Sequence, residues 1–162
     1  MPSYYAENLS AERLELCSEL APPSVKSYLA AEIERVCRRV DSSERVLELG
    51  CGYGRVLREL MHTGASEVGI DTSLQCLSMA QAYLDGEDHA SLILMDAVRL
   101  GFPSGVFDVV CCIQNGISAF RVDQRELLSE AVRVSKPGGR VVFSSYAVEF
   151  WKDRYYCFWR YG

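Results

Sequence analysis

A cluster of three glycines is the part of this sequence best suited to bind a ligand. The segment Glu48-Leu49-Gly50-Cys51-Gly52-Tyr53-Gly54 lies between an apolar stretch and a helical pattern. Glycines remove the Cβ atoms that would keep a bulky ligand away from the backbone, and they permit positive φ. The third glycine comes one residue earlier than in the Gly-x-Gly-x-x-Gly turn of dinucleotide-binding proteins, so we expect a ligand without phosphates.

Polar residues follow the later apolar stretches. Asp71 comes about 20 residues after the first glycine, the spacing expected for a carboxylate at the tip of the next strand. Asp96 closes another strand pattern, and Gln114-Asn115 closes a third. Carboxyl ends of parallel strands meet at one edge of a sheet, so these side chains should gather beside the glycine turn. Asp71 could also cap the helix after it, which is compatible with ligand binding, whereas Asp96 could simply begin a loop and Asn115-Gly116 could serve only as a turn.

Helical and strand patterns alternate along the chain, which predicts an α/β fold with a parallel sheet. Helices are expected over 23–40, 55–61, 73–84 and 125–134, and strands over 45–49, 67–71, 91–95, 107–113 and 140–145. A tight turn at Pro137-Gly138-Gly139 should lead into the last strand. The aromatic-rich residues 148–162 fit neither pattern cleanly.

The order of these motifs resembles the class I, Rossmann-like methyltransferases that use S-adenosyl-L-methionine, and most closely the UbiE-like group that acts on small molecules. The resembling motifs are Val46–Val56, Gly69-Ile70-Asp71, Met95-Asp96-Ala97, 107–113 and Lys136-Pro137-Gly138-Gly139. The resemblance covers about residues 41–146. It implies a three-layer α/β sandwich with a mostly parallel sheet in the order 3-2-1-4-5.

The resemblance also assigns roles to residues. Cofactor contacts are expected from the glycine turn and the strand tips: Glu48, Gly50, Cys51, Gly52, Tyr53, Gly54, Asp71, Thr72, Asp96, Ala97 and Gln114. Among these, Asp71 would hold the ribose hydroxyls, Asp96 the adenine amino group and Glu48 the methionine part. Tyr53 would either cover the cofactor or be exposed. Candidate substrate contacts are Asn115, Tyr146, Tyr4 and Tyr5, the last two as an N-terminal lid.

Methyl transfer from a sulfonium needs alignment and shielding rather than an acid or base, so no single catalytic residue is assigned. The product would be S-adenosyl-L-homocysteine. Two other functions stay open: a non-catalytic binding or regulatory module of the same fold, and an NAD(P)-dependent oxidoreductase. The glycine spacing and the Lys-Pro-Gly-Gly turn favour methyl transfer over the oxidoreductase.

The composition narrows the partners. The chain has 162 residues and a formal net charge of −5, which gives no basic footprint for nucleic acid or an anionic membrane. No apolar run suggests a membrane span or signal peptide, so we expect a cytoplasmic protein. The seven cysteines contain no Cys-x-x-Cys, which favours buried reduced thiols over a metal site. The Cys111-Cys112 pair lies inside a strand pattern rather than at the end of the strand, where a substrate would bind, which disfavours thiolate-based arsenic methylation.

The expected organisation has three parts: an N-terminal helical segment or lid over 1–40, the cofactor-binding domain over 41–147 and the aromatic-rich tail over 148–162. Class I domains have seven strands, and the sequence shows only five strand patterns, so the C-terminal strands are missing from the pattern. We therefore expect the fifth strand and the tail to be covered by further chain, by a partner or by a second copy in a homodimer.

Overall fold

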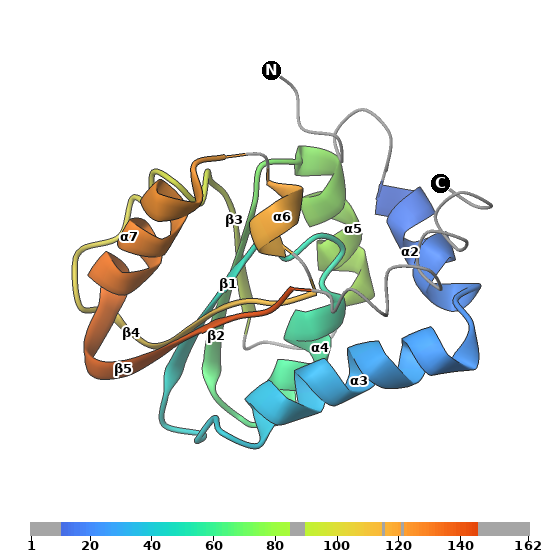
Figure 1. Cartoon of the computed structure of the whole chain (residues 1–162), viewed down its shortest axis with the longest axis horizontal. Coiled ribbons are helices and arrows are strands. Elements are labelled where there is room, and N and C mark those ends of the chain that lie inside the picture. The colour runs from blue at the N-terminus through green and yellow to red at the C-terminus, as the bar shows by residue number, and fades with distance from the viewer. Residues whose placement is uncertain (1–10, 85–89, 115, 121, 146–162) are drawn as a thin grey trace.

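The computed structural model describes residues 11–84, 90–114, 116–120 and 122–145 (Figure 1). Within them the strands are β1 (Arg45–Leu49), β2 (Ser66–Asp71), β3 (Ala90–Leu94), β4 (Phe107–Cys112) and β5 (Ser135–Phe143). The helices are α2 (Ala11–Glu19), α3 (Pro23–Cys37), α4 (Arg55–Met61), α5 (Leu74–Tyr83), α6 (Gly116–Ala119) and α7 (Gln124–Val134).

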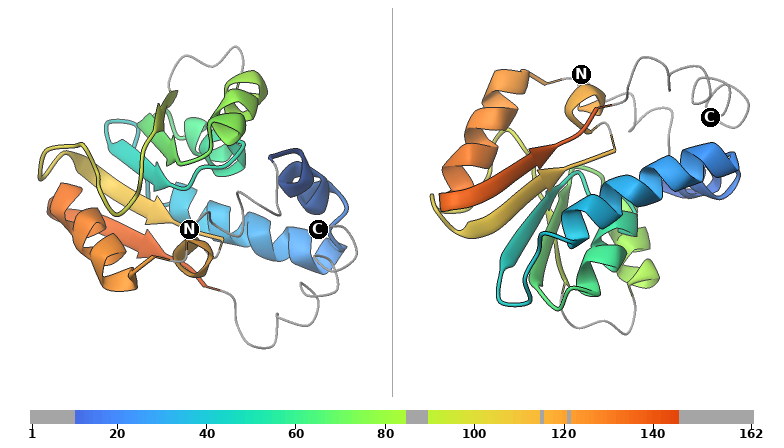
Figure 2. Two further views of the ribbon diagram at one scale, coloured as in Figure 1. Left: turned by 90° about the horizontal axis from the view of Figure 1, so that it is seen from above. Right: turned by 60° about the horizontal axis from the view of Figure 1, so that its bottom comes forward.

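The five strands form one parallel sheet in the order β3-β2-β1-β4-β5, which confirms the expected topology. Helices cover both faces, as Figures 1 and 2 show: α3, α4 and α5 lie on one side and α7 on the other. The architecture is therefore the expected three-layer α/β sandwich. None of the helices in the described ranges is long and apolar enough to cross a membrane.

The side chains of β4 point alternately to the two faces of the sheet, and they show how the apolar core is divided between the two helical layers. Val109 and Cys111 pack with Val46 and the helices α3 and α4, whereas Val110 and Cys112 pack with Leu47 under α7. Successive side chains of a strand point to opposite faces, so both faces of a covered strand must be apolar. This explains the unbroken apolar run in β4 and confirms that the vicinal cysteines face opposite ways.

Strand five differs from the expectation. It starts at Ser135, which pairs with Phe107, and its next pair is Arg140 with Val109. One residue of β4, Asp108, thus lies opposite four residues of β5, so Lys136–Gly139 bulge out within the strand rather than forming a turn before it. Gly138, with φ of +80°, makes this bulge possible, and the Lys136 ammonium bonds both carboxylate oxygens of Asp108 at 2.8 Å. The strand ends at Phe143, two residues earlier than predicted.

Other boundaries shift slightly, and two helices were not predicted. Helix α3 ends at Cys37 rather than Val40, because the chain turns before β1 with the amide of Val40 donating to the carbonyl of Cys37. Helices α2 and α6 were not expected as elements. The aromatic-rich tail lies outside the described residues.

Candidate functional site

The glycine turn joins β1 to α4 and has the backbone conformation that its glycines suggested. Gly50, Gly52 and Gly54 have φ of +74°, +54° and +91°, all in the region that side chains disfavour. The amides of Gly50 and Cys51 both donate to the carbonyl of Ile70, at 2.8 and 2.9 Å. The turn is thereby fixed to the carboxyl end of β2.

Little room for side chains exists around this turn. A Cβ atom on Gly50 would lie 2.4 Å from the Phe120 ring, just after α6. A Cβ atom on Gly52 would lie 3.2 Å from Leu14 of α2. Neither neighbour could be anticipated from the local pattern, because both come from distant segments. Phe120 and α2 therefore border the turn together with β1 and β2.

Asp71 ends β2 and braces the turn. Its Oδ2 accepts a hydrogen bond from the Gly52 amide (3.0 Å), and its Oδ1 accepts one from the Ser73 amide (2.8 Å). Burial raises the pKa of Asp71, while the backbone N–H donors of Ser73, Gly52 and Thr72 act to lower it. Ser73 is the N-cap of α5, with its hydroxyl accepting from the Cys76 amide. Asp71 thus supports both the glycine turn and the start of the helix.

Glu48 lies on β1 just before the turn and is 4% exposed. Its Oε2 atom has no hydrogen-bond partner among the described residues. Burial is the main cause that raises the pKa of Glu48 to about 8; Glu67 and Asp71 also act to raise this pKa, and Arg55 and the Leu57 amide act to lower it. A buried carboxyl oxygen without a partner is costly, which makes it a candidate ligand contact.

Asp96 and Ala97 follow β3 beside the tip of β2. The amide of Met95 donates to the carbonyl of Asp71 (3.0 Å), which brings this loop next to the turn. The Asp96 side chain is exposed and accepts from the Val98 amide (3.1 Å), while Ala97 is buried. Thr72, at the tip of β2, is exposed. The contact of these residues with the adenosine end of a ligand stays a prediction.

Tyr53 and Cys51 are buried side chains of the turn. Tyr53 is 5% exposed and packs edge-on against Tyr83, with ring centroids 5.4 Å apart, so the exposed alternative for Tyr53 is wrong. Burial raises the pKa of the Cys51 thiol. Burial likewise raises the pKa of Cys112 to about 12 and that of Cys111 well above its usual value. These thiols are protonated apolar groups at neutral pH.

Gln114 comes after β4 at the same edge of the sheet. Its side-chain oxygen accepts from Arg55 of α4, and its amide nitrogen donates to the carbonyl of Leu29 in α3 (3.4 Å). The other candidate substrate contacts, Asn115, Tyr146, Tyr4 and Tyr5, lie outside the described residues. Within the described ranges, no group of three His, Cys, Asp or Glu side chains could hold a metal ion.

A hollow of about 250 Å³ lies at the opposite edge of the sheet, at the amino ends of β1 and β4. Its charged side chains pair with one another: Arg140 with Glu44, and Lys136 with Asp108. The carboxyl ends of the strands, where the glycine turn, Glu48 and Asp71 meet, are the better candidate site.

This parallel sheet with a glycine turn after its first strand defines a Rossmann-like cofactor-binding domain. A family model described as "Methyltransferase domain" matches residues 47–143, and the chain belongs to that family.

Two relatives carry methyltransferase names, and a solved structure shares the fold. A demethylmenaquinone methyltransferase from Clavibacter sepedonicus is 35% identical over 106 residues, covering 65% of this chain and 42% of the relative. A 2-methyl-6-phytyl-1,4-hydroquinone methyltransferase from Synechocystis is 30% identical over 134 residues, covering 77% and 42%. The crystal structure of the PH0226 protein from Pyrococcus horikoshii superposes with a TM-score of 0.65 at 27% identity, covering 75% and 58%. The chain spans less than half the length of the two curated relatives.

Proposed function

We propose that this chain binds S-adenosyl-L-methionine and takes part in transferring its methyl group to a small-molecule acceptor. The observation that carries the proposal is the convergence of three features at one sheet edge. These are the positive-φ glycine turn, the Asp71 carboxylate bonded to it, and the buried Glu48 oxygen without a partner among the described residues. Membership of the methyltransferase family supports the same reading.

The residues present fit such a ligand. The Asp71 carboxylate accepts from the amides of Gly52 (3.0 Å) and Ser73 (2.8 Å) and also from the Thr72 amide, whereas a carboxylate has about four acceptor sites. Asp71 therefore retains acceptor capacity for a ribose hydroxyl. Thr72 would border the same end of the ligand, and Asp96 with Ala97 would meet the adenine.

The methionine end of the ligand would lie along the glycine turn. Glu48 would accept from its ammonium group, which would supply the partner that one Glu48 oxygen lacks. The ligand would approach the backbone of Gly50 and Gly52 next to the Phe120 and Leu14 side chains, with Cys51, Tyr53 and Gly54 completing the turn and Gln114 closing its far side.

When bound, the cofactor supplies a methyl group already activated by a positive sulfur. The chain's own part is to align the acceptor in line with that group and to exclude water, so no general base is required of it. Phe120, which packs on Gly50, gives the site an apolar border suited to excluding water. Asn115, Tyr146, Tyr4 and Tyr5 remain predicted acceptor contacts.

A small organic acceptor is supported by the names of the relatives, which specify a demethylmenaquinone and a phytyl hydroquinone. Within the described residues β5 is an edge strand, and α7 beside it exposes Leu128 and Val132, which are 39% and 61% exposed. A second copy or further chain covering this side is part of the proposal. The cytoplasmic location expected from the sequence stays a prediction.

Thermal unfolding with ligands tests the proposal. S-adenosyl-L-methionine at about 100 times its Kd should stabilise the chain by about 2.7 kcal/mol, and NADH should leave the midpoint unchanged. Asp96→Ala should reduce the ligand-induced shift, while Asp123→Ala, at the exposed N-cap of α7, should retain it. Stabilisation by NADH alone would favour the oxidoreductase. Stabilisation without formation of S-adenosyl-L-homocysteine on a panel of quinol, amine and thiol acceptors would favour the non-catalytic module.

A further inference from the structure

Gln114 has an unusual backbone conformation directly after β4. Its φ is +60°, and it is the one non-glycine residue with positive φ in the part of the chain that the structure describes. Its amide donates to the hydroxyl of Ser144 (2.8 Å), and the Ser144 amide donates to the carbonyl of Cys112 (3.1 Å). A side-chain-bearing residue is held in such a conformation only where its surroundings enforce it, often at functional sites.

This conformation directs the Gln114 side chain toward the helices on the α3 and α4 side of the sheet. Its amide group accepts from the guanidinium of Arg55 and donates to the carbonyl of Leu29. Arg55 is the first residue of α4, directly after the glycine turn. Gln114 therefore links α4, the helix that starts at the glycine turn, to α3.

Arg55 matters because it is the one cation among the groups that set the ionisation of Glu48. From β2, Glu67 and Asp71 raise the pKa of Glu48; from α4, Arg55 and the Leu57 amide lower it. Three thiols also lie within electrostatic reach of Glu48: Cys111 and Cys112 from β4, and Cys51 from the turn. Burial keeps these thiols protonated, so they add no charge. A displaced Arg55 would leave Glu48 facing carboxyl groups and neutral thiols.

We propose that Gln114 is a positioning residue that holds Arg55 beside Glu48 and thereby sets the charge of the carboxyl group that meets the cofactor. This inference rests on the proposed function, because it places the ammonium group of the cofactor at Glu48. An ionised Glu48 binds that cation better than a neutral one does. Affinity should therefore rise with pH as Glu48 ionises, around its pKa of about 8, and should fall again at the higher pH where the amino group of the ligand loses its own proton. Without the Gln114 amide, the midpoint of this rise moves to higher pH.

Two measurements on the full chain test the proposal: the pH dependence of S-adenosylhomocysteine binding by calorimetry, and the titration of the Glu48 side-chain carbon by NMR, assigned with Glu48→Gln. In Gln114→Ala both midpoints should rise by about half a pH unit, with binding about threefold weaker at pH 7. Arg55→Gln should raise them at least as far. Gln114→Ala added to Arg55→Gln should change them no further, because the two residues act through one contact.

Gln124→Ala, at the exposed first position of α7, is the matched control and should leave both midpoints unchanged. Gln114→Gly accommodates the positive φ and also lacks the amide, so it gives the same test if the alanine variant does not fold. Midpoints equal to those of the wild type in both Gln114 variants would overturn this inference and leave the proposed function standing. Shifts of the midpoints in Gln114→Ala and Arg55→Gln that add fully in the double variant would do the same. A folded wild-type chain that binds no S-adenosylhomocysteine at any pH would overturn the proposed function and this inference together.

Discussion

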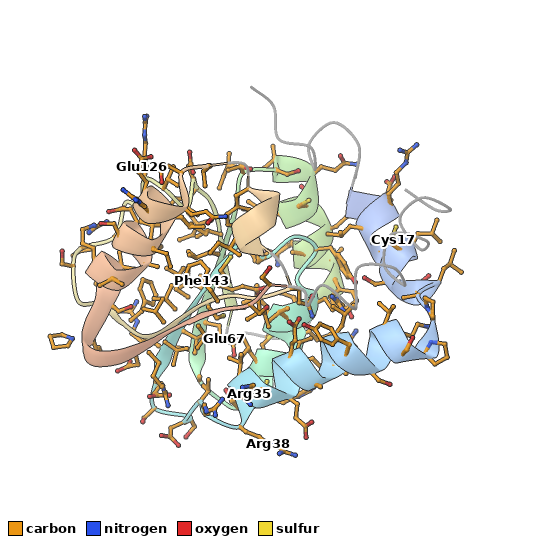
Figure 3. All side chains as sticks on the ribbon, viewed as in Figure 1. Cys17, Arg35, Arg38, Glu67, Glu126 and Phe143 are labelled. Carbon is orange, nitrogen blue, oxygen red and sulfur yellow. The ribbon has the colours of Figure 1, made fainter. Side chains whose placement is uncertain are left out.

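Glu67 gives the sharpest test of the electrostatics under α3. It lies on β2, is 1% exposed, and neither of its carboxylate oxygens has a hydrogen-bond partner among the described residues. Figure 3 shows it among the side chains between the sheet and α3. Burial raises its pKa from 4.5 to about 8. The folded chain therefore keeps Glu67 protonated at pH values where the unfolded chain has released that proton.

The sign and size of the effect follow from proton linkage. Between pH 4.5 and about 8 the unfolded state binds fewer protons at this position, so stability falls as pH rises and levels off above pH 8. A pKa rise of this extent corresponds to a loss of up to about 5 kcal/mol. Glu67→Gln removes the titration and keeps the shape. The variant should match the wild type near pH 5 and exceed it by several kcal/mol above pH 8.

Urea unfolding of both proteins from pH 5 to pH 9 measures this difference. Glu126→Gln is the matched control, because Glu126 is an exposed glutamate in the first turn of α7, also labelled in Figure 3. It should change stability by less than about 1 kcal/mol at any pH in the range. Parallel pH curves for Glu67→Gln and the wild type would refute the reasoning, since they would mean that Glu67 ionises equally in both states.

Three further changes test the local structure. Gly50→Ala should destabilise the chain by about 2 kcal/mol or more in urea unfolding, because an alanine disfavours the positive φ and its Cβ atom would clash with the Phe120 ring. Adding Phe120→Ala should recover only the part of the lost stability that comes from the clash. Full recovery would contradict the contribution of φ. Ser73→Ala should reduce stability by about 1 kcal/mol in the same assay, because the Cys76 amide loses its hydrogen bond to the Ser73 hydroxyl. Unchanged stability would contradict the role of Ser73 as the N-cap of α5. Leu127 lies on the buried face of α7, and Leu127→Ala should reduce stability by about 3 kcal/mol in thermal unfolding. A loss below about 1 kcal/mol would mean that α7 packs loosely on the sheet.

The sheet could be predicted from the sequence because its signals are local. Apolar runs give β1, β2 and β4, and α4 begins and ends at the expected residues, Arg55 and Met61. The positive φ of the glycine turn also follows from residue type alone.

The features that the sequence did not predict depend on contacts between residues that lie far apart along the chain. Lys136–Gly139 has the composition of a turn, yet Ser135 before it already pairs with Phe107, and only the partner strand reveals the bulge. Phe120 packs on Gly50 from 70 positions away. The contact of Gln114 with Arg55 depends on a positive φ that glutamine does not signal.

Asp71 has one of the roles considered from the sequence, at the start of α5, and a second role at the glycine turn that the sequence did not indicate, while its contact with a ribose stays a prediction. Its carboxylate accepts from the amide of Ser73 at the start of α5, and it also accepts from the amide of Gly52 in the glycine turn. A variant that lacks this carboxylate should therefore loosen the turn as well as remove a ligand contact. Any binding experiment on Asp71 needs a check of folding, and Asp71→Asn, which keeps one acceptor oxygen, is a milder companion to Asp71→Ala.

Calorimetric titration with S-adenosylhomocysteine tests the central claim most directly. The ligand is titrated into the wild type, Asp71→Asn and Asp71→Ala, each shown to be folded by circular dichroism, with NADH as the control ligand. We expect the wild type to bind S-adenosylhomocysteine and not NADH, Asp71→Asn to bind more weakly and Asp71→Ala more weakly still. A folded wild-type chain that binds no S-adenosylhomocysteine, or that binds it as tightly after loss of the Asp71 carboxylate, would contradict the account.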